Sequence, residues 1–184
     1  MKKKIAKKFF RKELEEFYSN LEYYFEQKKI KMDMEMKHNR NKYNIAKHIF
    51  KTLPNAHIIG IDTNKNNDEL FVVLSNKTIY LFGEQYKYWG TTPHIFFEER
   101  IIDYNYRDRK YIHIQDVIMV DNNIGNGTVA MKGLIKYAKQ NHFEYIDGGL
   151  SSVDNDHADR RNYYYEKFGF VIEGNYIKLD LSKV

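Results

Sequence analysis

Apolar residues near the start of the chain recur at steps of three and four. In residues 8–27 they are Phe9, Phe10, Leu14, Phe17, Leu21, Tyr24 and Phe25, and this spacing predicts an amphipathic helix. The segment "KIKMDMEMK", residues 29–37, instead alternates apolar and polar positions, which predicts a short strand. Helical spacing returns in residues 41–52. Pro54 follows the predicted end of this second helix, because proline cannot continue a helix.

Short apolar runs separated by polar turns begin at His57. They predict three short strands, over "HIIGID" (57–62), "ELFVVLS" (69–75) and "TIYLFG" (78–83). Two longer segments, "HIFFEERIIDYN" and "KYIHIQDVIMVD", predict antiparallel strands joined by the charged turn "YRDRK". Simple alternation along the second of them places His113 and Gln115 on one face and Asp116 on the other.

The remaining chain alternates between strand and helix patterns. A helix is predicted from Thr128 to about Gln140, with Met131, Leu134, Ile135 and Ala138 on one face, and then a strand in "FEYIDGGLSS". A second helix follows in "DNDHADRRNYYYEKFGF", with Asp156 as its N-cap and Gly169 in the left-handed position after its end. A closing hairpin turns at Gly174-Asn175. The strand–helix–strand crossover implies a parallel strand pair inside a mixed, mostly antiparallel sheet, and therefore an α/β fold.

Composition and charge narrow the class of protein. The chain has 184 residues, of which 42% are hydrophobic and 16% aromatic, so we expect one folded domain with a real core. Cysteine is absent, which excludes disulfides, thiolate metal sites and a cysteine nucleophile. Neither a membrane span nor a secretory signal is recognisable, so we expect a cytoplasmic protein without a membrane partner.

The positive charge is concentrated at the N-terminus. Residues 1–12 hold seven Lys and Arg and no acid, and removing these seven charges from the net +5 leaves −2. The rest of the chain is therefore no basic platform for nucleic acid. A nucleic-acid contact is expected only through this basic segment, whose other explanation is a solvated helix end that improves solubility.

Two glycines stand where the predicted strand ending at Val120 gives way to a helix. In Ile124-Gly125-Asn126-Gly127-Thr128, glycine permits positive φ and close approach to the backbone. Successive N–H groups and the positive end of the helix dipole would together suit phosphate. The alternative is that glycine only allows the chain to reverse direction. The spacing does not match the P-loop. The G-x-G-x-x-G dinucleotide fingerprint would have its last position at Ala130, where alanine is sometimes tolerated, but the predicted strands upstream are antiparallel and do not open a βαβ unit.

Two blocks of sequence together resemble the GNAT superfamily of acetyl-CoA-dependent N-acetyltransferases. The segment 122–127, "NNIGNG", is similar to the family motif [QR]-x-x-G-x-[GA], with Asn122 in place of Gln or Arg. The segment 164–170, "YYEKFGF", is similar to its second signature. The resemblance covers residues 94–181 as an acetyl-CoA-binding core. It implies one GNAT-like domain over 1–184, in which 1–55 form a variable, helical N-terminal region.

The resemblance implies a cofactor and a set of binding residues. Acetyl-CoA would lie where a central parallel strand pair splays apart in a sheet with helices on both faces. The pyrophosphate would lie on the backbone of Ile124, Gly125, Asn126, Gly127 and Thr128, with Asn122 at the start of the motif. The pantetheine arm would pair with the backbone near Met119 and Val120, and no metal is implied.

The implied reaction is direct acetyl transfer to a primary amine, without an acyl-enzyme. An N–H near Met119 or Val120 would stabilise the oxyanion, and Tyr165 would protonate the departing thiolate. The neighbouring Tyr163 and Tyr164 stay open as alternatives, and so does packing as the role of all three. No base is assigned. The polar residues on the nearby strands are His113, Gln115, Asp116 and Asp147.

Charged residues crowd the start of the last helix. Asp154 and His157 are interpreted as a helix cap, since two possible ligands are too few for a metal site. Arg160 or Arg161 could reach a phosphate of coenzyme A. The alternative function is a non-catalytic GNAT-like protein whose basic N-terminus contacts nucleic acid or a protein partner. The acceptor amine is not indicated by the sequence.

Overall fold

The computed structural model describes residues 2–87, 92–104, 107–121, 123–151 and 158–184. Contacts divide the chain into two compact units, Met1–Asn44 and Ile45–Val184. The described residues of the first unit are all helical, and the second unit contains the sheet with its covering helices.

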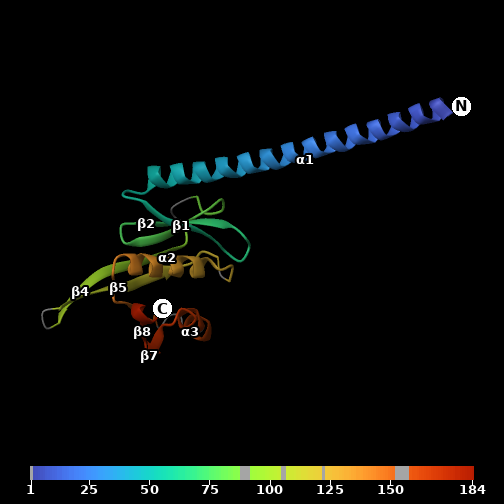
Figure 1. The fold of residues 1–184 in the computed structure, drawn as a ribbon. Helices are drawn as coiled ribbons and strands as arrows, with labels where there is room; N and C mark the ends of the chain where they lie inside the picture. The colour runs from blue at the N-terminus through green and yellow to red at the C-terminus, as the bar shows by residue number, and fades with distance from the viewer. Residues whose placement is uncertain (1, 88–91, 105–106, 122, 152–157) are drawn as a thin grey trace. The chain divides into compact units, whose positions relative to one another are not determined.

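One long helix, α1 (Lys2–Thr52), replaces the first three predicted elements (Figure 1). The helix predicted over 8–27 is confirmed, and the helix predicted over 41–52 is the end of the same element. The strand predicted over 29–37 is wrong. Its Met, Lys and Glu residues are good helix formers, and adding residues to an existing helix costs far less than starting a new element.

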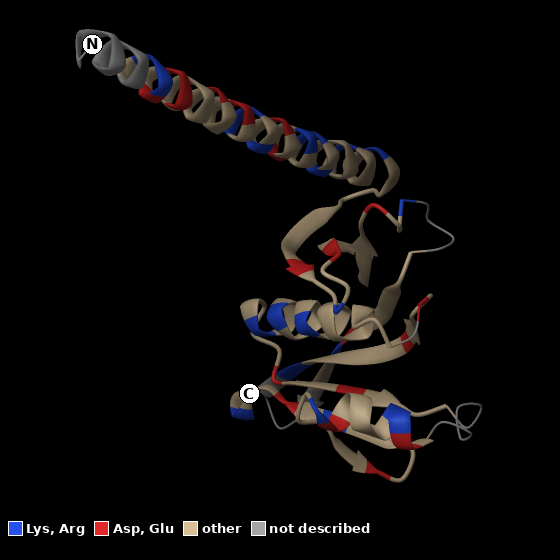
Figure 2. Ribbon diagram, turned by 90° about the vertical axis from the view of Figure 1, so that its right-hand side faces the viewer, with Lys and Arg blue, Asp and Glu red and all other residues tan. Residues whose placement is uncertain are grey.

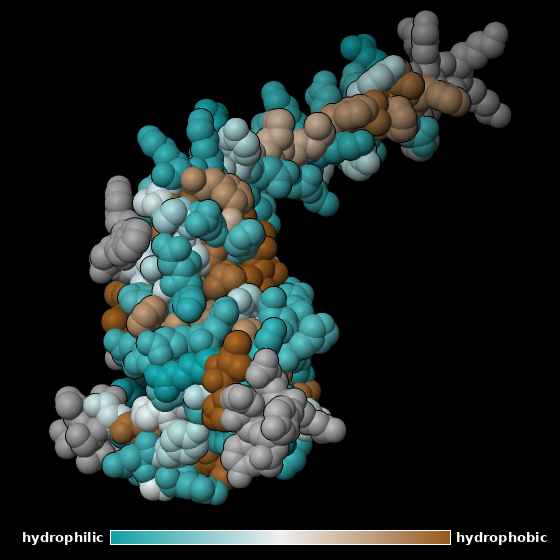
Figure 3. Space-filling view, turned by 90° about the vertical axis from the view of Figure 1, so that its left-hand side faces the viewer, coloured by the Kyte–Doolittle hydropathy of each residue, from teal (hydrophilic) through white to brown (hydrophobic). Residues whose placement is uncertain are grey.

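The first unit exposes large hydrophobic side chains along its helix (Figure 3). They include Phe10, Leu14, Phe17, Leu21, Phe25, Met32 and Met36, each more than a third exposed. Ile30 and Met34, which the strand prediction put on the same face as Met32 and Met36, are exposed as well. Residues two apart in a helix point in nearly opposite directions, so the alternating segment has no common face.

The second unit is built on an eight-stranded sheet in the order β1-β2-β3-β4-β5-β6-β8-β7. All neighbours are antiparallel except β5 and β6, which are parallel. The prediction of a mixed, mostly antiparallel sheet with one parallel pair is confirmed. The strands are β1 (His57–Thr63), β2 (Glu69–Ser75), β3 (Thr78–Phe82), β4 (His94–Tyr104), β5 (Arg107–Ile118), β6 (Tyr145–Gly149), β7 (Val171–Glu173) and β8 (Tyr176–Asp180).

The pair β4 and β5 forms the predicted long hairpin, but it differs in two places. The strands continue to Tyr104 and resume at Arg107, so most of the predicted turn "YRDRK" is strand. Opposite the step from Phe96 to Phe97, β5 also contains one additional residue, Gln115, which forms a bulge. Before the bulge, Ile112 and Ile114 face the core, and after it Val117 and Met119 do. The inward-facing residues therefore change from even to odd numbers, and the simple alternation predicted for β5 does not hold beyond Ile114.

Two hydrophobic clusters lie on opposite faces of β2 and β3. The larger includes Val72 and Ile79 together with α2 (Asn126–Gln140). The smaller joins Phe71 and Val73 to the C-terminal residues of α1. Helix α2 begins two residues before the predicted start at Thr128, and its predicted inner face is largely confirmed: Met131, Leu134 and Ala138 are fully buried, while Ile135 is partly buried.

The C-terminal elements follow the predicted order. Helix α3 (Ala158–Glu166) is followed by a turn that contains Gly169, whose φ of 88° confirms the predicted left-handed position after the helix. The N–H of Phe170 donates to the carbonyl oxygen of Tyr165 at 3.3 Å across this turn. The hairpin β7–β8 turns at Gly174 with φ of 61°, as predicted, and a short 3-10 helix, η3 (Leu181–Lys183), follows it. The predicted cap Asp156 lies outside the described residues.

Candidate functional site

The parallel pair β5–β6 opens at one end. Its register runs from Tyr111 opposite Tyr145 to Ile114 opposite Gly148 and stops there. Strand β5 continues to Ile118 and stays paired with β4. A cavity of about 430 Å³ lies at this opening, and its walls come from the ends of β5 and β6, the turn before α2, and helix α3.

The glycine turn forms one wall of this cavity. Gly125 is the N-cap of α2 with φ of 94°, and its carbonyl oxygen accepts the N–H groups of Thr128 and Val129 at 3.0 and 3.2 Å. A helix leaves its first N–H groups without partners inside the helix. At Asn126 and Gly127, which both line the cavity, these N–H groups and the helix dipole favour an anion.

The loop after β1 supports the glycine turn from behind. The N–H of Lys65 donates to the carbonyl oxygen of Ile124 at 2.8 Å. A Cβ on Gly125 would lie 3.2 Å from both the backbone nitrogen and the Cγ of Lys65. The turn is therefore held in a tight space that a larger residue at position 125 would disturb.

The side chain of Asn126 belongs to a buried polar network. Its Nδ2 donates to the hydroxyl oxygen of Tyr86 at 2.8 Å, and its Oδ1 accepts from Asn64 at 3.2 Å. The Tyr86 hydroxyl in turn donates to Asp121 at 2.6 Å. Burial, followed by this carboxylate, raises the pKa of Tyr86 to about 12. The side chain of Asn126 thus stabilises the turn, and its backbone is the part available to a ligand.

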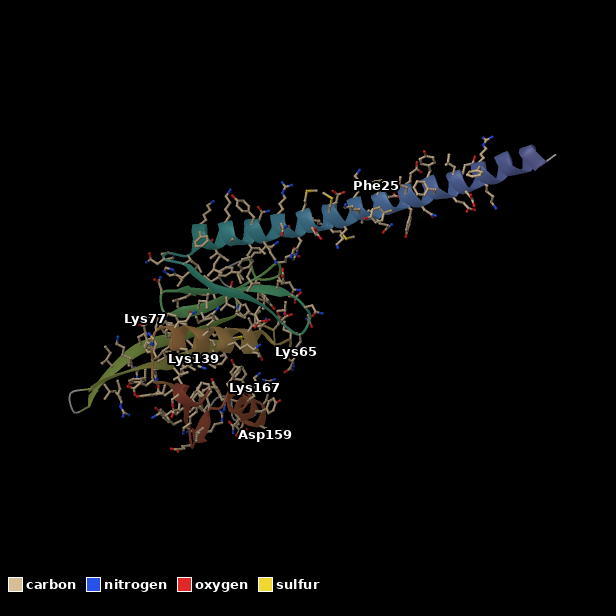
Figure 4. The ribbon with its side chains drawn as sticks, in the orientation of Figure 1. Phe25, Lys65, Lys77, Lys139, Asp159 and Lys167 are labelled. Atoms are coloured by element: carbon tan, nitrogen blue, oxygen red, sulfur yellow. The ribbon has the colours of Figure 1, made fainter. Side chains whose placement is uncertain are left out.

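Lysines gather around the same helix end. The Nζ of Lys167 donates to the Thr128 hydroxyl at 2.7 Å. Burial, then repulsion from Lys65 and Lys132, lowers the pKa of Lys167. Lys65 and Lys167 both line the cavity and lie near the start of α2 (Figure 4). The lysines of α2 itself, coloured blue in Figure 2, continue the positive charge along that helix. A bound anion would relieve this mutual repulsion.

Two arginines of α3 add to the positive lining. Arg160 and Arg161 both border the cavity, as the sequence suggested for a phosphate contact. The Nη1 of Arg161 donates to the carbonyl oxygen of Ser151 at 2.7 Å, which anchors it at the end of β6. The predicted cap residues Asp154 and His157 lie outside the described residues.

Three consecutive tyrosines of α3 border the cavity in different environments. Tyr163 is 69% exposed. The Tyr164 hydroxyl donates to the carbonyl oxygen of Gly127 at 2.8 Å, and burial strongly raises its pKa. Tyr165 is 8% exposed and packs its ring against Tyr164 and Phe170. The resemblance implied Tyr165 and left Tyr163 and Tyr164 open as alternatives, and the three residues have distinct surroundings in the structure.

Most of the residues named from the sequence meet in one place. The cavity is lined by Met119, Gly125, Asn126, Gly127, Thr128 and Tyr165. Val120 and Ile124 are not part of this lining: Val120 is 46% exposed, and the Ile124 carbonyl is used by Lys65. Asn122 lies outside the described residues.

Sequence reasoning missed Lys65 and Lys167 as cavity residues. Lys65 is some sixty positions away from the glycine turn, in a loop that reads as ordinary turn chemistry. Lys167 was matched only as the lysine of the second signature, with no role assigned to it. Nothing in the sequence indicated that the two lysines lie beside one helix terminus.

The four candidates for a base divide into two groups. Gln115 and Asp116 line the cavity. His113 and Asp147 contact each other, with His113 Nδ1 2.6 Å from Asp147 Oδ1. Their strands pair at this level, and they lie on the sheet face opposite the inward-facing Ile112 and Ile146.

Among the described residues, no three His, Asp or Glu side chains group closely enough to hold a metal ion. None of the helices in the described ranges has the length and apolar character needed to cross a membrane. Comparison with family models, curated proteins and solved structures found no match for this chain.

Proposed function

We propose that this protein is an N-acetyltransferase that moves an acetyl group from acetyl-CoA directly to a primary amine. One observation carries the proposal: the open end of the only parallel strand pair in the described sheet shares a cavity with a glycine turn, a helix N-terminus and two lysines. The two sequence blocks that resemble the GNAT superfamily, 122–127 and 164–170, both contribute to that cavity.

The phosphate end of coenzyme A would bind at the start of α2. The backbone N–H groups of Asn126 and Gly127 provide hydrogen-bond donors that do not titrate. Lys65 and Lys167 provide positive charge. Backbone donors at a helix N-terminus combined with nearby cations are a common way to hold a pyrophosphate. The 430 Å³ volume is in the range of sites for small molecules and cofactors.

The acyl end would extend into the opening between β5 and β6. Beyond Ile114, the side of β5 that faces away from β4 has no strand partner among the described residues, so an extended pantetheine arm can pair there like an additional strand. The N–H groups near Met119 and Val120 would then stabilise the oxyanion of the tetrahedral intermediate.

Tyr165 is the general acid in this proposal. It would protonate the thiolate of coenzyme A as the C–S bond breaks. Tyr164 is less suited, because its hydroxyl is already donated to the Gly127 carbonyl. Tyr163 is less suited because it is mostly exposed. Since the amine attacks the thioester directly, the absence of cysteine from the chain is compatible with the reaction.

Titration calorimetry with coenzyme A tests the binding half of the proposal. The wild-type protein should release heat, and Gly127→Glu should abolish it, because a carboxylate at the helix N-terminus would repel the pyrophosphate. Val171→Glu, at a 60% exposed position on β7, controls for the added charge. No heat from the wild-type protein, or equal binding by Gly127→Glu with an intact melting transition, contradicts the proposal.

Thiol release from acetyl-CoA in the presence of primary amines tests the chemical half. Tyr165→Phe should keep its affinity for coenzyme A and lose roughly 100-fold or more in kcat. Tyr163→Phe, which changes an exposed hydroxyl on the same helix, is the matched control. An unchanged kcat for Tyr165→Phe would remove this residue as the acid without removing the enzyme.

A further inference from the structure

A buried carboxylate lies behind the cavity, and the roles proposed above do not use it. The side chain of Asp147 is 6% exposed. Its Oδ1 lies 2.6 Å from His113 Nδ1, and its Oδ2 accepts the hydroxyl of Tyr176. Because a carboxylate can only accept, Nδ1 of His113 carries the proton, and Nε2 is left as a proton acceptor. The His113 side chain is 21% exposed, so solvent can reach it.

The strand register locates this cluster beside the open end of the parallel pair. His113 and Asp147 are opposite each other, one position before Ile114 and Gly148, the last pair that the two strands form. The next residues, Gln115 and Gly149, line the cavity. Tyr176 is opposite Gly149 on β8. His113 is therefore within one strand step of the opening where the thioester is proposed to lie.

Open space lies over the outer face of the sheet at Gly149. A Cβ built on Gly149 would meet no atom within 4 Å. Tyr176 of β8, opposite Gly149, is 41% exposed. On the other side of Gly149 lies β5, and beyond it Phe96 of β4, opposite Asp116, is 42% exposed. Gly149 thus leaves a gap between Tyr176 and the end of β5, with the ring of Phe96 one strand farther away. A ligand could enter here from the sheet face opposite α2.

We propose that this outer face is the acceptor site, that it takes a primary amine on an alkyl chain, and that His113 removes the amine's proton. This inference rests on the proposed acetyl transfer and deepens it. Asp147 and Tyr176 are positioning residues: they fix the tautomer and orientation of the His113 ring. Tyr176, opposite Gly149, provides apolar contact for the start of the alkyl chain, and Phe96, on the far side of β5, provides it for a chain that extends across the outer face.

The proton and bond changes balance across the two faces of the sheet. His113 Nε2 takes one proton from the ammonium group and returns it to water. The neutral amine then forms a C–N bond with the carbonyl carbon, and the C–S bond breaks. The thiolate takes the proton of the Tyr165 hydroxyl. The nitrogen loses its second proton, and this proton restores the Tyr165 hydroxyl. The products are an amide and coenzyme A.

Charged groups from every neighbouring strand surround His113. Glu98 of β4 interacts with it and is paired with Arg100 at 2.7 Å. On β6 and β8, the charged neighbours of the cluster are Asp147 and Lys178, and Lys178 lies over the ring of Tyr145. Tyr111 stacks on Tyr145 at 4.7 Å. The Glu98–Arg100 pair is neutral as a whole, so Asp147 is the carboxylate in direct contact with the ring.

The first test compares acetylation of butylamine by three proteins: wild type, His113→Gln and His57→Gln. His57 is an exposed histidine on β1 and serves as the matched control. His113→Gln should keep its thermal stabilisation by acetyl-CoA and lose roughly 100-fold in kcat near neutral pH. The loss should shrink at higher pH, where more of the butylamine is already neutral. A wild-type rate and pH profile for His113→Gln would overturn the inference.

Asp147→Asn tests the positioning role. An amide can donate to Nδ1 and so favour the wrong tautomer of His113. The expected result is a drop in kcat with little change in KM, together with a changed acidic limb of the rate–pH profile. Asp147→Glu, which keeps the carboxylate, should recover part of the rate. A merely structural Asp147 would leave the pH profile of the remaining activity unchanged.

A second measurement does not depend on turnover. Coenzyme A alkylated on sulfur with N-butyl chloroacetamide carries an amide and an alkyl chain into the acceptor position. The wild-type protein should bind this conjugate about tenfold more tightly than coenzyme A, because the chain is partly buried. Gly149→Val should remove that difference by filling the gap. If both proteins show the same difference, the acceptor does not lie over Gly149.

The two proposals fail in different ways. A wild-type protein that binds no coenzyme A contradicts the proposed function itself. A protein that binds coenzyme A and acetylates butylamine, yet is insensitive to His113→Gln and Gly149→Val, remains an acetyltransferase whose acceptor site is elsewhere.

Discussion

The two glycines of the turn before α2 serve different physical needs. Gly125 adopts φ of 94°, a conformation that other residues rarely tolerate. Gly127 has ordinary φ but little room, because an added Cβ would lie 3.0 Å from the Tyr164 ring. The Tyr164 hydroxyl also donates to the Gly127 carbonyl. The turn and helix α3 are thus linked at this one residue.

Gly127→Ala should therefore lower both the free energy of unfolding and the affinity for coenzyme A. We expect a loss of about 1 kcal/mol in the free energy of unfolding, since the ring must move by a few tenths of an ångström. Urea unfolding measures this change. Gly149→Ala, at a position with nothing within 4 Å of its Cβ, should leave the stability nearly unchanged. Equal effects of the two substitutions would contradict the steric argument.

Lys167 should contribute to anion binding through its charge. Its pKa is lowered by burial and by the nearby Lys65 and Lys132, so a bound anion would stabilise its charged form. Lys167→Met should weaken coenzyme A binding about tenfold and reduce the salt dependence of that binding. Titration calorimetry at two salt concentrations measures both effects. Lys110→Met, at an exposed position of β5, should change neither.

At the scale of elements, α1 shows how context decides between helix and strand. The alternating methionines of residues 29–37 match a strand pattern, yet they are helical. A strand needs a partner for its backbone groups, and no described strand pairs with this segment. A helix satisfies its own backbone, so a segment with helical neighbours on both sides continues as helix.

The end of α1 within the second unit allows a matched pair of substitutions. Ile49 is fully buried in the cluster with Phe71 and Val73, whereas the next residue, Phe50, is 59% exposed. Ile49→Ala should cost about 2–5 kcal/mol of unfolding free energy. Phe50→Ala should stay within about 0.5 kcal/mol. Chemical denaturation measures both, and similar losses would mean that this part of α1 does not pack as described.

The bulge at Gln115 is a second feature at the scale of elements, because it determines which residues of β5 face the core. It lets Ile112 and Ile114 face the core before it and Val117 and Met119 after it. It also brings Gln115 and Asp116 to the opening of the parallel pair. If the same sequence formed a regular strand without a bulge, alternation from Ile114 would turn Val117 and Met119 away from the core.

At the scale of the whole molecule, the buried tyrosines link stability to alkaline pH. Burial is the largest cause of the raised pKa values of Tyr86 and Tyr164. A tyrosine whose pKa is raised in the folded state stabilises the fold at pH values below the unfolded pKa of 10.0. This stabilisation is lost as the pH rises towards the folded pKa. For Tyr86 the loss occurs between pH 10 and about 12.

The free energy of unfolding should therefore fall steadily above pH 10. Urea titrations at several pH values, followed together with phenolate absorbance, check this expectation. The buried tyrosines should ionise only as the protein unfolds. Constant stability through pH 12, with full ionisation of folded protein, would contradict it. Tyr86→Phe should lose less stability across this interval than the wild-type protein, because one of the linked groups is gone.

The sequence alone determined the elements whose signals are local. Glycine and asparagine mark the β7–β8 turn, Pro54 marks the end of a helix, and the spacing of Met131, Leu134 and Ala138 marks the inner face of α2. These features depend on backbone preference and periodicity, which a few neighbouring residues specify. The strand–helix–strand order also implied the parallel pair β5–β6, because a crossover of that length allows it.

Only the tertiary structure decided what depends on distant residues. It brought Lys65 and Lys167 to one helix terminus, directed the Tyr164 hydroxyl to Gly127, and paired His113 with Asp147 behind the open strands. It also made residues 29–37 helical. Each outcome depends on which elements become neighbours, and sheet order and packing, rather than local spacing, set that neighbourhood.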